Sequence, residues 1–166
     1  MDGWISAQKL PGRSASSGVV TVRKFKDPTY VLLEPLTWQP NNGQFAQIVE
    51  VPKGFVTDFA SIPWPFSLLV RPDGEAAYPA IIHDYLYWEQ TRSRSAADQV
   101  FKFAMEDFGI TGAAITTIYA AVDWLGQKYW DENAKLKAAG EKRILMKFPD
   151  DPTVSWQEWK NRPGVF

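Results

Sequence analysis

The sequence predicts an α+β fold, in which a small N-terminal antiparallel sheet packs on about three C-terminal helices. β-branched stretches broken by turn residues occupy residues 19–62, and apolar residues with helical spacing dominate residues 75–140. Strands followed by helices along the chain are typical of the α+β class. With 166 residues, 45% of them hydrophobic, and no internal repeat, we expect one domain that spans residues 1–166.

Three strands are expected in the N-terminal region. Each is rich in β-branched or aromatic residues and ends near turn-forming residues: Val19–Phe25, Thr29–Glu34 and Gln44–Val51. Residues 1–18, which are rich in Ser, Gly and Pro, predict an irregular arm. The stretch Pro52–Pro63 is expected to leave the sheet, with a tight turn at Gly54.

Three helices are expected in the C-terminal region, and each has recognisable start or stop signals: Glu75–Gln90, Ala96–Phe108 and Gly112–Ala139. Pro79 lies near the first turn of the first helix, where proline is tolerated. Either Ser93 or Ser95 can cap the second helix, and Gly109 suits its end. Thr111 can cap the third helix.

The tail, residues 141–166, is short and rich in aromatic residues, among them Trp156, Trp159 and Phe166. Two interpretations remain open. The aromatic rings could pack on the domain itself, or they could dock on a neighbouring subunit. Both uses bury large apolar surfaces, so composition does not choose between them.

Composition excludes several kinds of site. The net charge of −1 gives no electrostatic footprint for nucleic acid, and we expect no nucleic-acid partner. The sequence has no cysteine and a single histidine, which excludes disulfides, thiol chemistry and sites built from several imidazoles. A metal site would use oxygen ligands, which favours Ca²⁺ or another divalent cation such as Mg²⁺. No apolar run suits a transmembrane helix, and no Sec-type signal peptide is recognisable.

The single histidine lies in the most informative stretch, Pro79–Trp88. On a helix, His83 and Tyr87 are one turn apart and share a face, while Asp84 lies about 100° round the axis. Asp98, in the first turn of the next helix, could accept a hydrogen bond from one imidazole nitrogen and so orient the other as a general base. Asp84 could hold a divalent cation. The alternative is a buried imidazole–carboxylate pair that only joins two helices.

Three further residues are candidates for contacts with a substrate. Asp58 and Ser61 precede the helix that contains His83, and their loop could fold over the histidine. The same side chains are good local turn formers. Arg94 could bind an anionic group of a substrate, or it could pair with a carboxylate of its own helix.

The motif His83-Asp84-x-x-Tyr87, followed by Asp98 in an Ala-Ala-Asp triplet, resembles the active-site pair of helices in secreted and microbial phospholipases A2. The resemblance implies that His83 activates water, that Asp84 binds calcium, and that Asp98 and Tyr87 complete the hydrogen-bond network. It also implies a membrane lipid as substrate. Neither a glycine-rich calcium loop nor a disulfide accompanies the motif in this sequence.

A wider resemblance is carried by three blocks of sequence: Gly54–Pro63, Ala80–Tyr87 and Arg94–Met105. Together they resemble an uncharacterised family, domain of unknown function 1353, whose members are found largely in tailed bacteriophages and prophages. The resemblance implies phage or prophage origin and brings no established activity. The sequence departs from the family pattern at Trp64, where a basic residue is expected.

Three functional hypotheses follow. The first is a hydrolase, phospholipase A2-like or directed at a cell-envelope bond, in which His83 activates water, Asp98 orients His83 and Asp84 holds a cation. The second is a non-enzymatic component of a phage tail or baseplate, whose aromatic ends contact other phage structural proteins. The third is a phage effector that binds a host protein. We expect the protein in the host cytoplasm when it is expressed, with incorporation into the virion under the second hypothesis.

Overall fold

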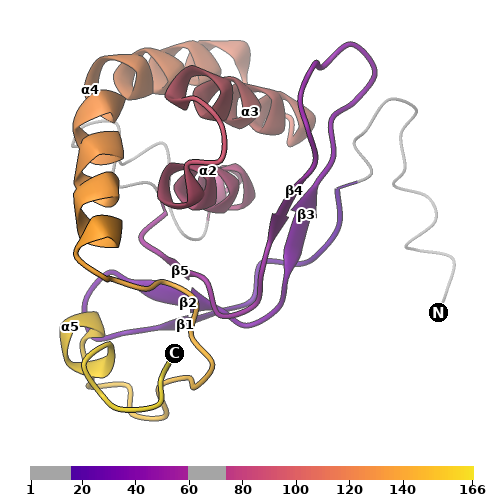
Figure 1. Cartoon of the computed structure of the whole chain (residues 1–166). Helices are drawn as coiled ribbons and strands as arrows, with labels where there is room; N and C mark the ends of the chain where they lie inside the picture. Colours follow the sequence, from indigo (N-terminus) through magenta and orange to yellow (C-terminus); the bar gives the residue numbers. More distant parts are fainter. Residues whose placement is uncertain (1–15, 60–73) are drawn as a thin grey trace, which may run out of the picture.

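A computed structural model describes residues 16–59 and 74–166 of the chain. It confirms the α+β fold class, because small antiparallel sheets in the N-terminal half are followed by helices in the C-terminal half (Figure 1). Ser61, Trp64 and the predicted arm as far as residue 15 lie outside the described residues.

The strands form two small sheets. One sheet has the order β1-β2-β5 and contains β1 (Val22–Lys24), β2 (Tyr30–Leu32) and β5 (Val56–Thr57). The other is a hairpin of β3 (Leu36–Trp38) and β4 (Val49–Val51). All pairings are antiparallel, and they place Val31 opposite Val56 and Leu36 opposite Val51.

The three predicted strands are confirmed in place as β1, β2 and β4, although each contains only three residues. The prediction that Pro52–Pro63 leaves the sheet is wrong near its centre, because Val56 and Thr57 pair with β2. Whether such a short segment forms a strand depends on the strand it pairs with, because two or three residues are too few to show the alternation of apolar and polar residues that marks a strand in sequence. Gly54 does adopt a positive φ, 89°, in a turn just before β5.

The three predicted helices are confirmed with slightly shifted ends: α2 (Ala77–Glu89), α3 (Arg94–Asp107) and α4 (Gly112–Ala138). Ser93 caps α3 by accepting a hydrogen bond from the Ala96 amide, and Thr111 caps α4. Gly109 follows α3 with φ of 74°. Because α3 begins two residues before the predicted start, Asp98 is the fifth residue of the helix and not the third, about half a turn further in than expected.

α2 lies at the centre of the molecule, with α3 and α4 to one side of it and strands β4 and β5 to the other (Figure 1). Ala80, Ile81 and Ile82 are fully buried, although successive residues of a helix point in different directions. A helix enclosed by neighbours is apolar around most of its surface. A polar side chain in the middle of α2 is therefore inside the protein and needs a partner.

The tail packs on its own chain. After α4 it returns to the first sheet, where the Val56 amide donates to Arg143 O and the Leu145 amide donates to Gly54 O, both at 2.8 Å. A single helical turn, α5 (Trp156–Trp159), follows. A second apolar cluster joins the tail to the strands: Phe25, Val31, Val56, Leu145, Val154, Trp156, Trp159 and Val165. This packing favours the interpretation that the aromatic rings of the tail cover the domain itself.

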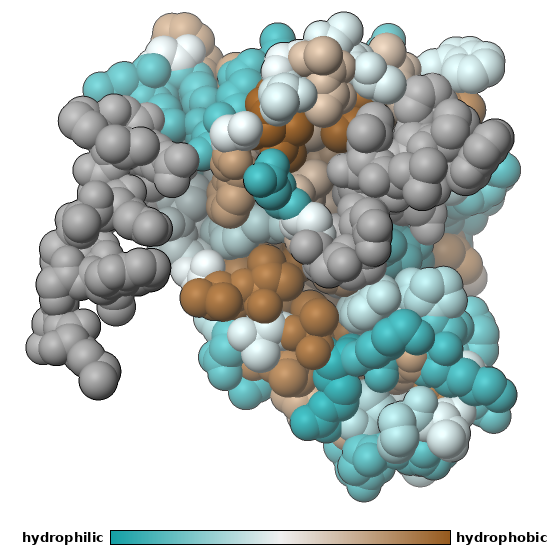
Figure 2. Space-filling view, turned by 180° about the vertical axis from the view of Figure 1, so that it is seen from behind, coloured by the Kyte–Doolittle hydropathy of each residue, from teal (hydrophilic) through white to brown (hydrophobic). Residues whose placement is uncertain are grey.

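The surface is mixed in character. Figure 2 shows that hydrophilic side chains dominate the lower part of the face seen from behind, whereas apolar side chains gather near its middle. Among the described residues, two aromatic side chains are strongly exposed, Phe45 at 97% and Trp124 at 81%. Where the structure describes the chain, no helix combines the length and the apolar character that a membrane span requires.

Candidate functional site

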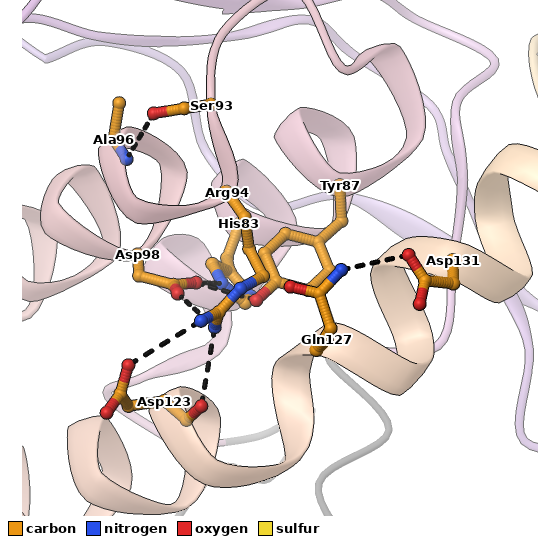
Figure 3. A network of polar contacts seen from close by, with 9 residues as sticks. All are labelled: His83, Tyr87, Ser93, Arg94, Ala96, Asp98, Asp123, Gln127 and Asp131. Carbon is orange, nitrogen blue, oxygen red and sulfur yellow. Dashed lines mark hydrogen bonds and ion pairs between the residues drawn. The ribbon is translucent and has the colours of Figure 1, made fainter.

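His83 on α2 and Asp98 on α3 form a buried hydrogen-bonded pair (Figure 3). The Nε2 atom of His83 lies 2.9 Å from the Oδ1 atom of Asp98. The two residues are only 4% and 2% exposed. The short connector between α2 and α3, residues 90–93, lets the two helices pack against each other. The structure thus brings together the two residues that the sequence singles out.

The carboxylate of Asp98 accepts two further hydrogen bonds. The Tyr87 hydroxyl donates to Oδ1 at 2.7 Å, and Nη1 of Arg94 donates to Oδ2 at 2.9 Å. Tyr87 lies one turn after His83, and Arg94 lies one turn before Asp98, so helical spacing places each donor beside the carboxylate. Three donors hold the carboxylate in one orientation. Arg94 therefore points into the protein, toward Asp98.

The imidazole of His83 lies between two aromatic rings. The Phe101 ring stacks on it with centroids 4.5 Å apart and planes at 25°. The Tyr87 ring lies 4.1 Å away at 43°. Trp130 from α4 in turn packs edge-on against Tyr87, with centroids 5.2 Å apart. These contacts restrict rotation of the imidazole, as a preorganised site requires.

α4 encloses the network on another side. Arg94 donates through Nη1 to Asp123 O at 3.5 Å, and its Nη2 lies 3.7 Å from the Asp123 carboxylate (Figure 3). Gly126 faces Tyr87 so closely that a Cβ at this position would lie 2.3 Å from the tyrosine hydroxyl. Sequence reasoning missed Asp123 and Gly126. The signal for Gly126 is a glycine inside a long helix, which lowers helix stability unless close packing needs it.

The electrostatics of the network favour a neutral histidine. Burial lowers the pKa of His83 below its ordinary value, and the hydrogen bond with Asp98 opposes this shift without cancelling it. Burial, followed by the hydrogen bond to Asp98, raises the pKa of Tyr87. The ring of His83 is thus uncharged near neutral pH. Because Asp98 is the acceptor for Tyr87 and Arg94, the proton of the imidazole lies on Nε2, and Nδ1 carries the lone pair.

Asp84 lies next to His83 but has different contacts. The hydroxyl of Thr57 on β5 donates to Asp84 Oδ2 at 2.5 Å and accepts from the Phe59 amide at 3.0 Å. Asp58, between Thr57 and Phe59 in sequence, is exposed, and Ser61 is outside the described residues. Where side chains are described, no group of three or more His, Asp or Glu residues could hold a metal ion. Asp84 therefore joins α2 to β5.

A second polar cluster lies at the other end of α3. Asp107 accepts side-chain hydrogen bonds from Trp38 Nε1 at 3.0 Å, Asn41 Nδ2 at 2.7 Å and Gln44 Nε2 at 2.9 Å. These contacts attach the β3–β4 hairpin to α3. Sequence reasoning missed them because the partners are far apart in sequence. Asp107 is a useful control for Asp98, since both are carboxylates of α3 with three donors.

Comparison with known families gives one match. The model of a family described as a protein of unknown function (DUF1353) matches residues 30–122, more than half of the 166 residues. The chain belongs to this family. The DUF1353 region contains β2 to β5, α2 and α3, and with them every member of the His83 network except Asp123, Gly126 and Trp130. No curated protein and no solved structure shows significant similarity to the chain.

Proposed function

We propose that the protein is a hydrolase in which His83 is the general base and Asp98 orients it. The observation that carries the proposal is the 2.9 Å hydrogen bond between His83 Nε2 and Asp98 Oδ1, with Asp98 itself held by Tyr87 and Arg94. A histidine base needs a neutral ring, a fixed tautomer and a partner that stabilises the imidazolium. The surroundings of His83 agree with all three requirements.

In the proposed reaction, Nδ1 of His83 removes a proton from a water molecule while the water oxygen attacks the carbonyl carbon of an ester. Positive charge develops on the ring, and Asp98 stabilises it through the Nε2–H hydrogen bond. The imidazolium then returns the proton to the departing alkoxide, which leaves as an alcohol. Tyr87 and Arg94 contact Asp98 and act as positioning residues.

The substrate class that we propose first is a membrane-lipid ester, because the His83-Asp84-x-x-Tyr87 motif resembles that of phospholipases A2. A cell-envelope bond is the second class. The lipid resemblance implies calcium at Asp84. Calcium takes six to eight oxygen ligands, and the described side chains supply no cluster of carboxylates around Asp84. No step of the proposed reaction is therefore assigned to a metal.

We also propose a phage or prophage origin, with expression in the host cytoplasm. This proposal is supported by the three sequence blocks, Gly54–Pro63, Ala80–Tyr87 and Arg94–Met105. Two of these blocks contribute His83 and Asp98, so the most informative part of the family pattern coincides with the network.

A non-enzymatic role, as a component of a phage tail or baseplate, is the second candidate. The burial of His83 favours it, because a ring that is 4% exposed between two aromatic neighbours suits a contact that joins α2 to α3. In such a role the exposed side chain of Phe45, at the β3–β4 hairpin, would contact other virion proteins.

Hydrolysis assays separate the two candidates. The purified protein is incubated with phospholipid vesicles, with a chromogenic short-chain ester and with peptidoglycan, each with and without calcium. The hydrolase proposal predicts turnover of one of these substrates and a loss of about 10²–10⁴-fold in His83→Gln. Glutamine keeps an N–H group that can donate to Asp98 but has no basic nitrogen.

Two carboxylate variants make the test specific. Asp98→Asn should also reduce the rate strongly, whereas Asp107→Asn, the same change at the other end of α3, should leave it unchanged. Circular dichroism checks that each variant is folded. Equal rates in the native protein and in folded His83→Gln would overturn the hydrolase proposal, as would the absence of turnover on every substrate. Calcium-dependent turnover that is lost in Asp84→Asn, or that then needs a higher calcium concentration, would assign a cation to Asp84.

A further inference from the structure

A groove separate from the His83 network lies between β4 and the last turns of α2, which run close to each other (Figure 1). Its volume is about 360 Å³, which is within the range of small-molecule sites. Its walls come from residues 48–50, from Tyr85 and Glu89, and from Arg92 in the α2–α3 connector. Helical spacing places Tyr85 and Glu89 on the side of α2 away from His83.

Arg92 forms a cationic end of the groove. Its Nε–H group is buried and has no hydrogen-bond partner. Burial lowers the pKa of the guanidinium, and no carboxylate of the described residues compensates for this. A buried donor without an acceptor is unfavourable and uncommon in folded proteins. The side chain of Arg92 therefore marks a position where an incoming acceptor would stabilise the protein.

Glu50 and Glu89 form an acidic end of the same groove. Both glutamates line the groove together with Tyr85, and after burial their charges raise the pKa of the Tyr85 hydroxyl. Glu89 is 4.0 Å from Lys137 Nζ, while Glu50 is exposed. The groove thus carries opposite charges on different elements, with Glu50 on β4 and Arg92 in the α2–α3 connector.

We propose that this groove binds a small zwitterion of the amino-acid type, with its carboxylate on Arg92 and its ammonium group beside Glu50 and Glu89. A carboxylate in the groove can draw the guanidinium toward it and accept from the Nε–H group that is otherwise unpaired. The ammonium group meets two carboxylates and the aromatic ring of Tyr85. A simple anion would be repelled by the glutamates, and a simple cation would leave Arg92 without a partner.

NMR titration with three probes of the same carbon skeleton tests this proposal. 4-Aminobutyrate carries both charges, butyrate carries only the negative one, and butylamine carries only the positive one. We expect 4-aminobutyrate to shift the Arg92 Nε–H signal and the backbone amides of Glu50 and Glu89, with the millimolar affinity typical of so small a ligand. Butyrate and butylamine should bind at least about tenfold more weakly, because each lacks one charged contact.

Variants of the groove sharpen the result. Arg92→Gln should abolish binding of 4-aminobutyrate, and Glu50→Gln should weaken it while raising the affinity for butyrate, because one repelling carboxylate is removed. Arg162→Gln is the matched control, because Arg162 lies in the tail, where its guanidinium is 4.8 Å from the Trp159 ring. This variant should bind 4-aminobutyrate like the native protein. Three results would each overturn the proposal: no shifts with 4-aminobutyrate, unchanged binding in Arg92→Gln, or equal affinity for butyrate and 4-aminobutyrate. None of these readouts depends on hydrolysis or on His83.

Discussion

The protonation state of His83 couples the stability of the protein to pH. In an unfolded chain a histidine titrates near pH 6.5, whereas in the folded protein burial lowers the pKa of His83. Folding therefore holds the ring in its neutral form over a range of pH in which the unfolded chain is protonated. The same shift supplies the lone pair that a general base needs near neutral pH. One physical cause, burial, thus sets both the pH dependence of stability and the protonation state that the proposed chemistry needs.

The sign of the pH dependence follows from this shift. Between the two pKa values the unfolded chain binds a proton that the folded chain does not, so the free energy of unfolding rises with pH there. The contribution of His83 is complete above about pH 6.5 and is lost as the pH falls toward the lowered pKa of the folded state. Below about pH 6.5, the free energy of unfolding of the native protein in urea should fall by up to about 1.4 kcal/mol for each unit decrease in pH. His83→Gln should lack this slope, and an equal slope in both proteins would assign it to another group.

At the scale of secondary-structure elements, α4 shapes the network through the absence of a side chain. Gly126 lets the helix approach Tyr87 so closely that a Cβ would lie 2.3 Å from the hydroxyl and 3.1 Å from Arg94 Nη1. Both of these groups donate to Asp98. The position of α4 and the geometry around Asp98 are therefore linked, although Gly126 makes no polar contact of its own with the carboxylate.

Gly126→Ala tests this link between α4 and α2. Alanine favours helix by about 1 kcal/mol over glycine, but here overpacking should outweigh the gain and destabilise the protein by about 1–3 kcal/mol. Gly112→Ala is the control on the same helix, since no atom lies within 4 Å of its Cβ position, and it should be neutral or slightly stabilising. Tyr87→Phe removes the atom that the new Cβ would strike. In a double-mutant cycle, Tyr87→Phe should therefore reduce the destabilisation caused by Gly126→Ala. Strictly additive effects of the two substitutions would contradict a contact between these positions.

Across the whole molecule, the turn before β5 connects the sheet to the tail. The Leu145 amide donates to Gly54 O, and the Val56 amide donates to Arg143 O, both at 2.8 Å. The Arg143 guanidinium also lies 4.5 Å from the ring of Trp88 at the end of α2. One short segment of the tail thus contacts the sheet and the central helix.

Gly54→Ala should disrupt this connection. Its φ is 89°, and a Cβ there would lie 2.2 Å from the backbone oxygen of Leu145, which cannot move aside as a side chain can. We expect a loss of about 2–4 kcal/mol in the free energy of unfolding. Gly43 is the control: its φ is 90°, and no atom lies within 4 Å of its Cβ position. Gly43→Ala should therefore lower the free energy of unfolding by only about 1 kcal/mol, from backbone strain alone. Equal losses in urea unfolding would show that the Leu145 contact does not matter.

The parts of the structure that sequence predicts are those governed by local signals. Ser93, Thr111 and Gly109 bound the helices through contacts within one turn, and the His83–Asp98 pair follows from helical spacing and a short connector. The strand β5 and the role of Gly126 depend on partners elsewhere in the chain, so no local period indicates them. The exposed fraction of a candidate residue such as His83 also depends on partners elsewhere in the chain, so it could not be predicted from local sequence.

The measurement that tests the proposed site most directly is an NMR titration of the imidazole of His83, the single histidine of the chain. Long-range ¹H–¹⁵N spectra report its tautomer and its pKa together. A base oriented by Asp98 predicts the Nε2–H tautomer near pH 7, a pKa below the ordinary value of about 6.5, and a change of both in Asp98→Asn but not in Asp107→Asn. An Nδ1–H tautomer, or a pKa at or above about 6.5, would contradict the orientation of His83 on which the proposed function rests.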